Sequence, residues 1–104
     1  GILTQNSEHL AERHFNAVGW SSKDIPVVVK EFGEAKWNLL PTRDMVKLAK
    51  ELIQENPDVG AIVLECSVIP PHARAIQEAT GLPVFDITTA IKLVHAAVDP
   101  PDYY

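Results

Sequence analysis

The sequence predicts an α/β fold: a four-stranded parallel sheet with helices on both faces. Short apolar runs alternate along the chain with stretches of helical periodicity, which is typical of βαβ units with right-handed crossovers. The run Ala61-Ile-Val-Leu64 is uninterrupted, so it suits a central strand covered on both sides better than a strand with one exposed side. With 104 residues, 46% of them hydrophobic and 22% charged, the chain is large enough for a single core.

Four short segments are expected to be strands. They are residues 2–4, 25–32, 61–66 and 83–86. The second contains Val27-Val28-Val29, which is strongly β-prone, and Pro26 lies at its edge, where a missing N–H is tolerated. The sequence begins with Gly1 and not with Met, and the first predicted strand begins at the next residue. We therefore expect the chain to be a piece of a longer protein.

Helices are expected at residues 8–18, 42–55, 70–80 and 87–98. Gly19 and Gly81 follow the first and third helices as stop signals, and Pro41-Thr42 opens the second. Asp86 or Thr88 is the expected cap of the last helix.

The remaining segments divide the chain into one domain and a tail. Residues 33–40 lack clear periodicity but contain Trp37 and Leu39, so we expect a packed loop there. Residues 99–104 begin with Asp-Pro-Pro and are expected to form a loose tail. The single α/β domain therefore spans residues 1–98.

The chemistry is expected where the central strand ends. Ligands of parallel sheets bind beyond the carboxyl ends of the strands, and Cys66, the only cysteine, lies at such an end. Ser67 follows it in a tight connection to a helix led by Pro70 and Pro71. A thiol that faces the start of a helix is favoured as thiolate, and an anion beside it is also favoured.

Composition argues against several other classes of function. The net charge of -5 and the lack of any Lys/Arg cluster give no attraction to nucleic acid or to an anionic membrane surface. No apolar run is long enough to span a membrane, and no signal peptide is expected. A single cysteine cannot form an internal disulfide, so a cytoplasmic setting is expected. The four histidines show no ligand spacing with the cysteine, so no metal site is expected.

Three segments together resemble a known family. They are residues 1–6, 60–70 and 81–86, which read GILTQN, GAIVLECSVIP and GLPVFD. They are similar to the carboxyl-terminal lobe of the aspartate/glutamate/hydantoin racemase superfamily. The resemblance implies one lobe of a two-lobed, cofactor-independent enzyme whose first lobe is missing here.

The resemblance also implies roles for individual residues. Cys66 would be one of two acid/base thiols that transfer a proton at the α-carbon of a small carboxylate or amino acid. Ser67, Thr4 and Asn6 would contact that substrate. A lone lobe would expose the surface that its partner covers, so either the missing lobe or self-association is expected as a partner.

Several alternatives stay open at this point. Glu65 stands where the family has glycine, and Val68 where racemases have His or Glu, so the substrate is undefined and a cysteine-dependent decarboxylase or maleate-type isomerase fits as well. A non-catalytic remnant that binds an anion or a partner, and a flavodoxin-like interaction module with Cys66 in its core, are the other two readings. Ser67, Thr4 and Asn6 would then be helix caps, and Glu65 is expected to be a solvated charge.

Overall fold

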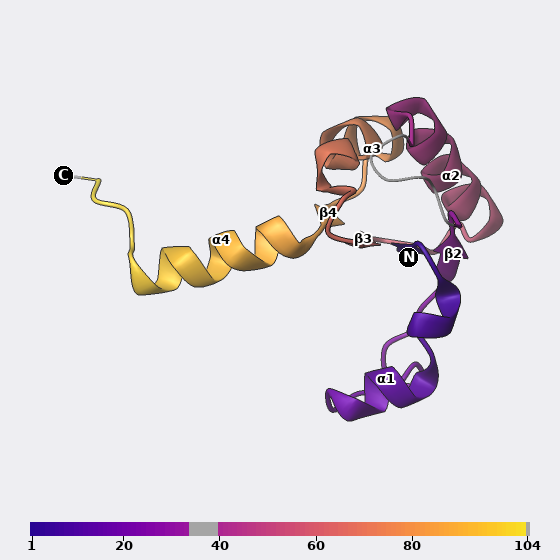
Figure 1. Ribbon diagram of the computed structural model, residues 1–104, viewed down its shortest axis with the longest axis horizontal. Helices are drawn as coiled ribbons and strands as arrows, with labels where there is room; N and C mark the ends of the chain where they lie inside the picture. Colours follow the sequence, from indigo (N-terminus) through magenta and orange to yellow (C-terminus); the bar gives the residue numbers. More distant parts are fainter. Residues whose placement is uncertain (34–39, 104) are drawn as a thin grey trace.

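The computed structural model describes residues 1–33 and 40–103. Its centre is a sheet of four parallel strands in the order β2-β1-β3-β4 (Figure 1). The strands are β1 (Ile2–Thr4), β2 (Val29–Glu31), β3 (Ile62–Glu65) and β4 (Val84–Phe85). The predicted α/β class and the four-stranded parallel sheet are confirmed.

The described residues form four α-helices and two 3-10 turns. They are α1 (Glu12–Ala17), α2 (Thr42–Glu55), α3 (Ala73–Thr80) and α4 (Ile87–Val98), with 3-10 turns η1 (Ser7–His9) and η2 (Pro70–His72). Gly81 ends α3 in the left-handed conformation, with φ of 71°, which side chains other than glycine rarely adopt. At the start of α4, the carboxylate of Asp86 accepts hydrogen bonds from the N–H groups of Thr88 and Thr89.

The core lies between one face of the sheet and the helices α2 and α3. Its centre is a cluster of buried apolar side chains: Leu3, Met45, Ala49, Leu52, Ile62, Leu64, Ile69 and Ile76. Lys30 points from β2 to the same side, where its Nζ donates to the Glu55 carboxylate at 3.1 Å. This single-sided core fixes the register of the strands, because a slip by one residue would turn its apolar side chains away from α2 and α3.

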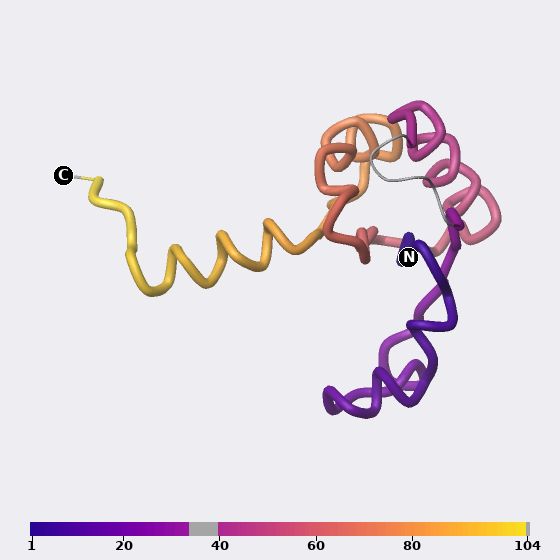
Figure 2. Tube along the Cα trace, in the orientation of Figure 1, coloured from indigo at the N-terminus to yellow at the C-terminus, as the bar shows by residue number. Residues whose placement is uncertain are grey.

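The opposite face of the sheet is largely uncovered by the described residues. Figure 1 shows α1 on the side away from α2 and α3, and Figure 2 shows α4 extending away from the rest of the chain. Val63 in β3 is 40% exposed and Phe85 in β4 is 50% exposed. The expectation that the 61–64 run is covered on both sides is therefore met on one side only, and the coverage predicted for the other side is wrong within this chain.

Other differences from expectation concern element length. The strand predicted at 25–32 is only Val29–Glu31, because it is an edge strand whose partner β1 offers three residues for pairing. The first helix is also shorter than predicted. Phe15 is its one buried side chain, and it stacks on Trp20 with ring centroids 4.4 Å apart.

The last two predicted segments are the loop at residues 33–40 and the tail after residue 98. The packed loop predicted at 33–40 lies almost entirely outside the described residues. Residues 99–103 follow α4 without helix or strand and are exposed. None of the helices in ranges 1–33 and 40–103 is long and apolar enough to cross a membrane.

Candidate active site

The strand order puts the topological switch point of the sheet at the carboxyl ends of β1 and β3. The chain leaves β1 toward β2 on one side, and the later strands β3 and β4 lie on the other side. In open parallel sheets this reversal of direction is the switch point, where the loops that follow the two neighbouring strands separate and leave room for a ligand. Thr4 and Glu65 end these two strands and are paired in register.

A hydrogen bond joins the two strand ends at this point. The Oγ1 of Thr4 donates to Oε2 of Glu65 over 2.7 Å, and Thr4 itself is fully buried. The same hydroxyl oxygen accepts from the N–H of Asn6 at 3.3 Å. The side-chain oxygen of Asn6 in turn accepts from the N–H of Glu8 at 2.9 Å, so Asn6 caps the turn η1.

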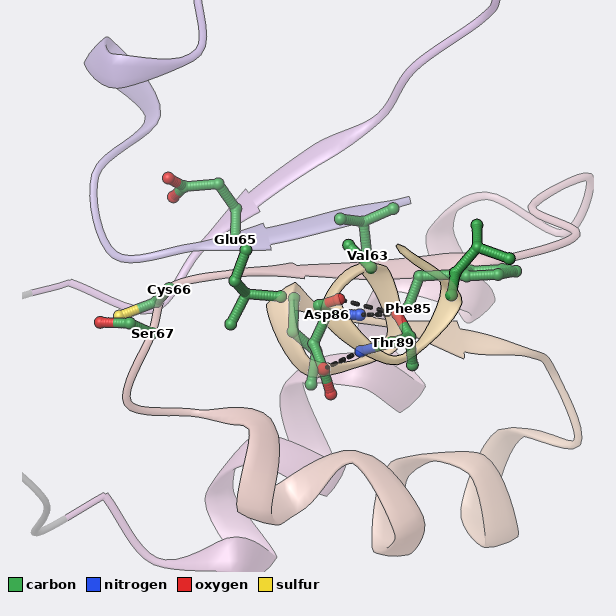
Figure 3. Close-up of a pocket in the computed structure, with 11 residues that line it drawn as sticks. Val63, Glu65, Cys66, Ser67, Phe85, Asp86 and Thr89 are labelled. Carbon is green, nitrogen blue, oxygen red and sulfur yellow. Dashed lines mark hydrogen bonds between the residues drawn. The ribbon is translucent and has the colours of Figure 1, made fainter. Parts of the chain in front are cut away.

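An open cavity of about 790 Å³ lies near this switch point, lined by residues of β3, of the loop that follows it, of β4 and of the first turns of α4. Its polar lining comes from Glu65, Cys66, Ser67, Asp86 and Thr89, and the rest of its lining is apolar. Figure 3 shows Cys66 and Ser67 together beyond the end of β3, with Glu65 and Val63 projecting to one side of the strand. A mostly apolar cavity with a few polar groups at one end is typical of small-molecule sites.

The predicted site residues fall into two groups. Cys66 and Ser67 line the cavity, and Cys66 is partly exposed and free. Thr4 and Asn6 are not among the described residues that line it. Thr4 reaches the site through Glu65, and Asn6 contributes to the structure of the preceding turn.

The loop after Cys66 offers main-chain donors. Among the described residues, no hydrogen bond is recorded for the N–H groups of Ser67 and Val68, whereas the N–H of Ile69 bonds to the carbonyl oxygen of Cys66. The helix predicted to start near Pro70 begins as the 3-10 turn η2, and α3 itself begins at Ala73. The cysteine is therefore followed by a loop whose first two amides have no partner among residues 1–33 and 40–103, and not directly by an α-helix.

Asp86 has the environment of a structural carboxylate. Its Oδ1 accepts from the N–H and Oγ1 of Thr88 and from the N–H of Thr89. Burial opposes its ionisation, but these hydrogen bonds and the charge of Lys92 prevail, so the pKa of Asp86 lies below its ordinary value. This agrees with the cap predicted from the sequence.

Two residues that sequence reasoning did not place in the site also line the cavity. Glu65 is exposed, as expected, and its carboxylate accepts the hydrogen bond from Thr4 on β1. Phe85 lies on β4, paired in register with Val63. Both residues could have been found from the sequence. Side chains alternate between the two faces of a strand, and this alternation puts Val63, Glu65 and Phe85 on one face of the sheet.

Comparison with known proteins gives a consistent result at the level of sequence. A dimethylsulfoniopropionate lyase of Durusdinium sp. clade D is 41% identical over 63 residues, which is 60% of this chain and 21% of that protein. Dimethylsulfoniopropionate lyase 5 of Emiliania huxleyi is 40% identical over 65 residues, 62% of this chain and 13% of that protein. Lyase 7 of the same organism is 39% identical over 64 residues, 57% of this chain and 19% of that protein.

The relatives found are all named dimethylsulfoniopropionate lyases. No protein-family model and no solved structure matches the chain. The chain spans about a fifth or less of the length of these curated lyases.

This finding corrects the resemblance drawn from the sequence. The relatives carry the name of a lyase and none is named a racemase, so the racemase superfamily assignment and the racemase function predicted from it are wrong. The isomerase class is wrong for the same reason. Short motifs at a strand end, such as Glu65-Cys66-Ser67, report the local geometry of a site and do not define the reaction that it performs.

Proposed function

We propose that this chain forms part of the active site of an enzyme that cleaves dimethylsulfoniopropionate. The observation that carries the proposal is the 39–41% identity to three dimethylsulfoniopropionate lyases over about three fifths of the chain. A free thiol that lines an open cavity near the switch point of the sheet supports it.

The proposed reaction is an elimination. A base removes a proton from the carbon next to the substrate carboxylate, and the electron pair forms a carbon–carbon double bond. The bond between the neighbouring carbon and the sulfonium sulfur breaks, its electron pair stays on sulfur, and the products are dimethyl sulfide and acrylate. The proton remains on the base, and no oxidant or reductant is needed.

Cys66 is the residue we propose as that base. A thiolate is a suitable acceptor for a carbon-bound proton, and Cys66 is the one cysteine of the sequence and lines the cavity. Ser67, which lines the cavity, is then the proposed contact of the substrate carboxylate, through its hydroxyl and its N–H group. Donors to this carboxylate would stabilise the negative charge that develops on it as the proton leaves.

The test is the release of dimethyl sulfide by the complete polypeptide that the gene encodes, measured by gas chromatography. Cys66→Ala is expected to lower kcat by at least about 100-fold, since general-base catalysis contributes this much or more. Gln54→Ala, a change at an exposed position of α2, is the matched control and should leave kcat unchanged. A parent protein that releases no dimethyl sulfide, or a Cys66→Ala variant at full rate, would refute the proposed function.

The same proposal includes a reducing, cytosolic compartment. The chain's only cysteine is free in the structure, and a reactive thiol at an accessible strand end is best preserved where disulfides are rare.

A further inference from the structure

The helix α4 leaves the sheet with almost no connection. β4 ends at Phe85 and α4 begins at Ile87, so Asp86 is the single residue between them. Asp86 is tied to the first turn in both directions: its Oδ1 accepts from the N–H groups of Thr88 and Thr89, and its own N–H donates to Oγ1 of Thr89 at 3.0 Å. These hydrogen bonds fix the direction in which α4 leaves the strand. The helix therefore extends away from its own sheet and cannot turn back over it without breaking the cap (Figure 2).

The apolar side of α4 is left uncovered by the described residues. Residues three, four and seven positions apart share one side of a helix, and in α4 such positions hold Ile87, Ala90, Ile91, Val94 and Val98. Ile91, Val94 and Val98 are 60%, 63% and 76% exposed. The opposite side carries polar residues such as Lys92. An amphipathic helix of this kind is stable when its apolar side packs against another surface.

The sheet has the complementary gap in its covering. Val63 and Phe85 are paired in register on the face away from α2 and α3, and they are 40% and 50% exposed. Together with Ile87, Ala90 and Leu93 of α4 they line the cavity of about 790 Å³. Parallel sheets are normally covered by helices on both faces. The described chain thus has a sheet face without a helix and a helix without a sheet.

The cavity is larger and more apolar than the proposed substrate requires. Cavities of about 300–1,000 Å³ hold drug-sized ligands, whereas dimethylsulfoniopropionate is a small molecule with two charges. Its place under the proposed function is the polar end of the cavity, beside Cys66 and Ser67. The apolar remainder is suited to another occupant, and an amphipathic helix is a common occupant of an apolar groove.

The exposed apolar area matches what an interface between two copies requires. Seven apolar side chains of the sheet face and of α4 are between 40% and 76% exposed: Val63, Phe85, Ile87, Ile91, Leu93, Val94 and Val98. At roughly 60–120 Å² for each apolar side chain that is fully covered, they offer on the order of 500 Å² per copy. A standard interface buries about 800 Å² per partner, and somewhat more than half of that area is apolar. A second copy can therefore cover both surfaces with the usual amount of apolar contact.

We propose that two copies of this chain pair about a two-fold axis, with α4 of each copy seated over the uncovered sheet face of the other. A two-fold pair uses the same two surfaces in both directions, so neither the helix nor the sheet face is left uncovered. Each cavity is then completed by α4 of the other copy, which closes the apolar side and keeps water away from Cys66. The pairing stands on the geometry of α4 and the sheet, and its role in the active site rests on the proposed function.

The test mixes two variants of the complete polypeptide. Val94→Lys puts a charge on the apolar side of α4, at a position that does not line the copy's own cavity. In sedimentation velocity it should raise the dissociation constant of the pair at least about tenfold, because each interface loses a buried valine and meets a charge. Its release of dimethyl sulfide should fall as the pair dissociates.

The second variant, Cys66→Ala, keeps α4 intact but lacks the proposed base. In a mixed pair its intact helix covers the sheet face of the copy that still has Cys66. Mixing the two variants, at concentrations where the unmodified protein is paired, should therefore raise the release of dimethyl sulfide at least about threefold above the sum of the separate variants.

Ala96→Lys is the matched control on the same helix. Ala96 is exposed and lies four residues after Lys92, so it shares the polar side of α4. The added charge then lies away from the interface, and both the dissociation constant and the release of dimethyl sulfide should stay within about twofold of the unmodified protein.

Hydrogen exchange tests the pairing without reference to activity. The amides of α4 should be protected in the pair and should exchange faster when the protein is diluted below its dissociation constant, because a helix of 12 residues is marginal in water by itself. Val94→Lys should remove this protection at concentrations where Ala96→Lys retains it.

The outcomes separate this inference from the proposed function. A complete polypeptide that stays monomeric would overturn the pairing, and protection of α4 in that monomer would show that another segment of the polypeptide covers it. Equal effects of the two lysines, or an active enzyme that shows no recovery on mixing, would overturn the inference as well. A protein that releases no dimethyl sulfide but pairs in a Val94-dependent way would refute the proposed function and leave the pairing standing.

Discussion

Thr4 illustrates how one buried hydroxyl joins two strands and a loop. It donates to Glu65 and accepts from the N–H of Asn6, so it holds the end of β3 and the loop after β1 together without lining the cavity. Replacement by valine keeps the shape but leaves the Asn6 N–H and the Glu65 carboxylate without this partner.

We expect Thr4→Val to lower the free energy of unfolding by about 1–2 kcal/mol, which is the usual effect of leaving such groups unsatisfied. Thr4→Ser retains the hydroxyl and should lose less than half as much. Urea denaturation followed by circular dichroism measures both, with equal slopes as the check on two-state behaviour. A valine variant as stable as the parent would mean that water replaces the hydroxyl at no cost.

The environment of Asp86 leads to a prediction about how the cap of α4 depends on pH. Its pKa is lowered from the ordinary value of 3.8, since its hydrogen bonds from Thr88 and Thr89 outweigh burial. A carboxyl with a lowered pKa in the folded state stabilises that state above its unfolded pKa, and the contribution is lost as pH falls through the lower, folded value.

The start of α4 should therefore remain capped down to pH values below 3.8. The measurement is an NMR titration of the Thr88 and Thr89 amide signals, which report the ionisation of the carboxylate that they contact. In Asp86→Asn the same signals should not follow this titration, because the amide side chain does not ionise. A midpoint above 3.8 in the parent would contradict the cap geometry.

The helices α3 and α4 differ in how much of their apolar surface is buried. Ile76 of α3 is fully buried in the core, whereas Ile91 of α4 is 60% exposed. The same substitution at both positions separates packing from intrinsic helix preference.

We expect Ile76→Ala to lower the free energy of unfolding by about 2–4 kcal/mol, since it removes buried methyl groups and leaves a cavity. Ile91→Ala should change it by less than about 0.5 kcal/mol, as substitutions at exposed positions do. Thermal and urea unfolding of the two variants provide the comparison. Similar losses at both positions would show that α4 is packed in solution.

The elements were predictable where local chemistry defines them. The boundaries of α2, the stop at Gly81 and the cap at Asp86 each depend on side chains within a few residues. The length of β2 was not predictable, because it depends on how many residues of β1 are available to pair.

The candidate site also has a part that was predictable from the sequence and a part that was not. Cys66 at a strand end could be found from the order of residues alone. The contact of Thr4 with Glu65 joins positions 61 residues apart and depends on the register of β1 against β3, which no local pattern reports. The reaction was predicted wrongly because a strand-end thiol suits several reactions, and the residues that line the cavity come from more than one strand.

At the scale of the whole molecule, apolar surface is unevenly covered. One face of the sheet is sealed by α2 and α3, and the other presents Val63 and Phe85. Leu93 and Val98 of α4 are 74% and 76% exposed. A lone helix of 12 residues is marginal in water, so α4 would be more stable against another surface.

The predicted partner remains a proposal, and we expect the isolated chain to associate with itself through this surface. Sedimentation velocity over a range of concentrations should show a weight-average mass that rises with concentration. Leu93→Lys, which puts a charge on α4, should raise the dissociation constant at least about tenfold, because each copy in the complex loses a buried leucine. Gln54→Lys makes a comparable change on the outer side of α2 and should have little effect. A single monomer peak at every concentration, or equal effects of the two lysines, would show that α4 and the uncovered face are stable in water as they stand.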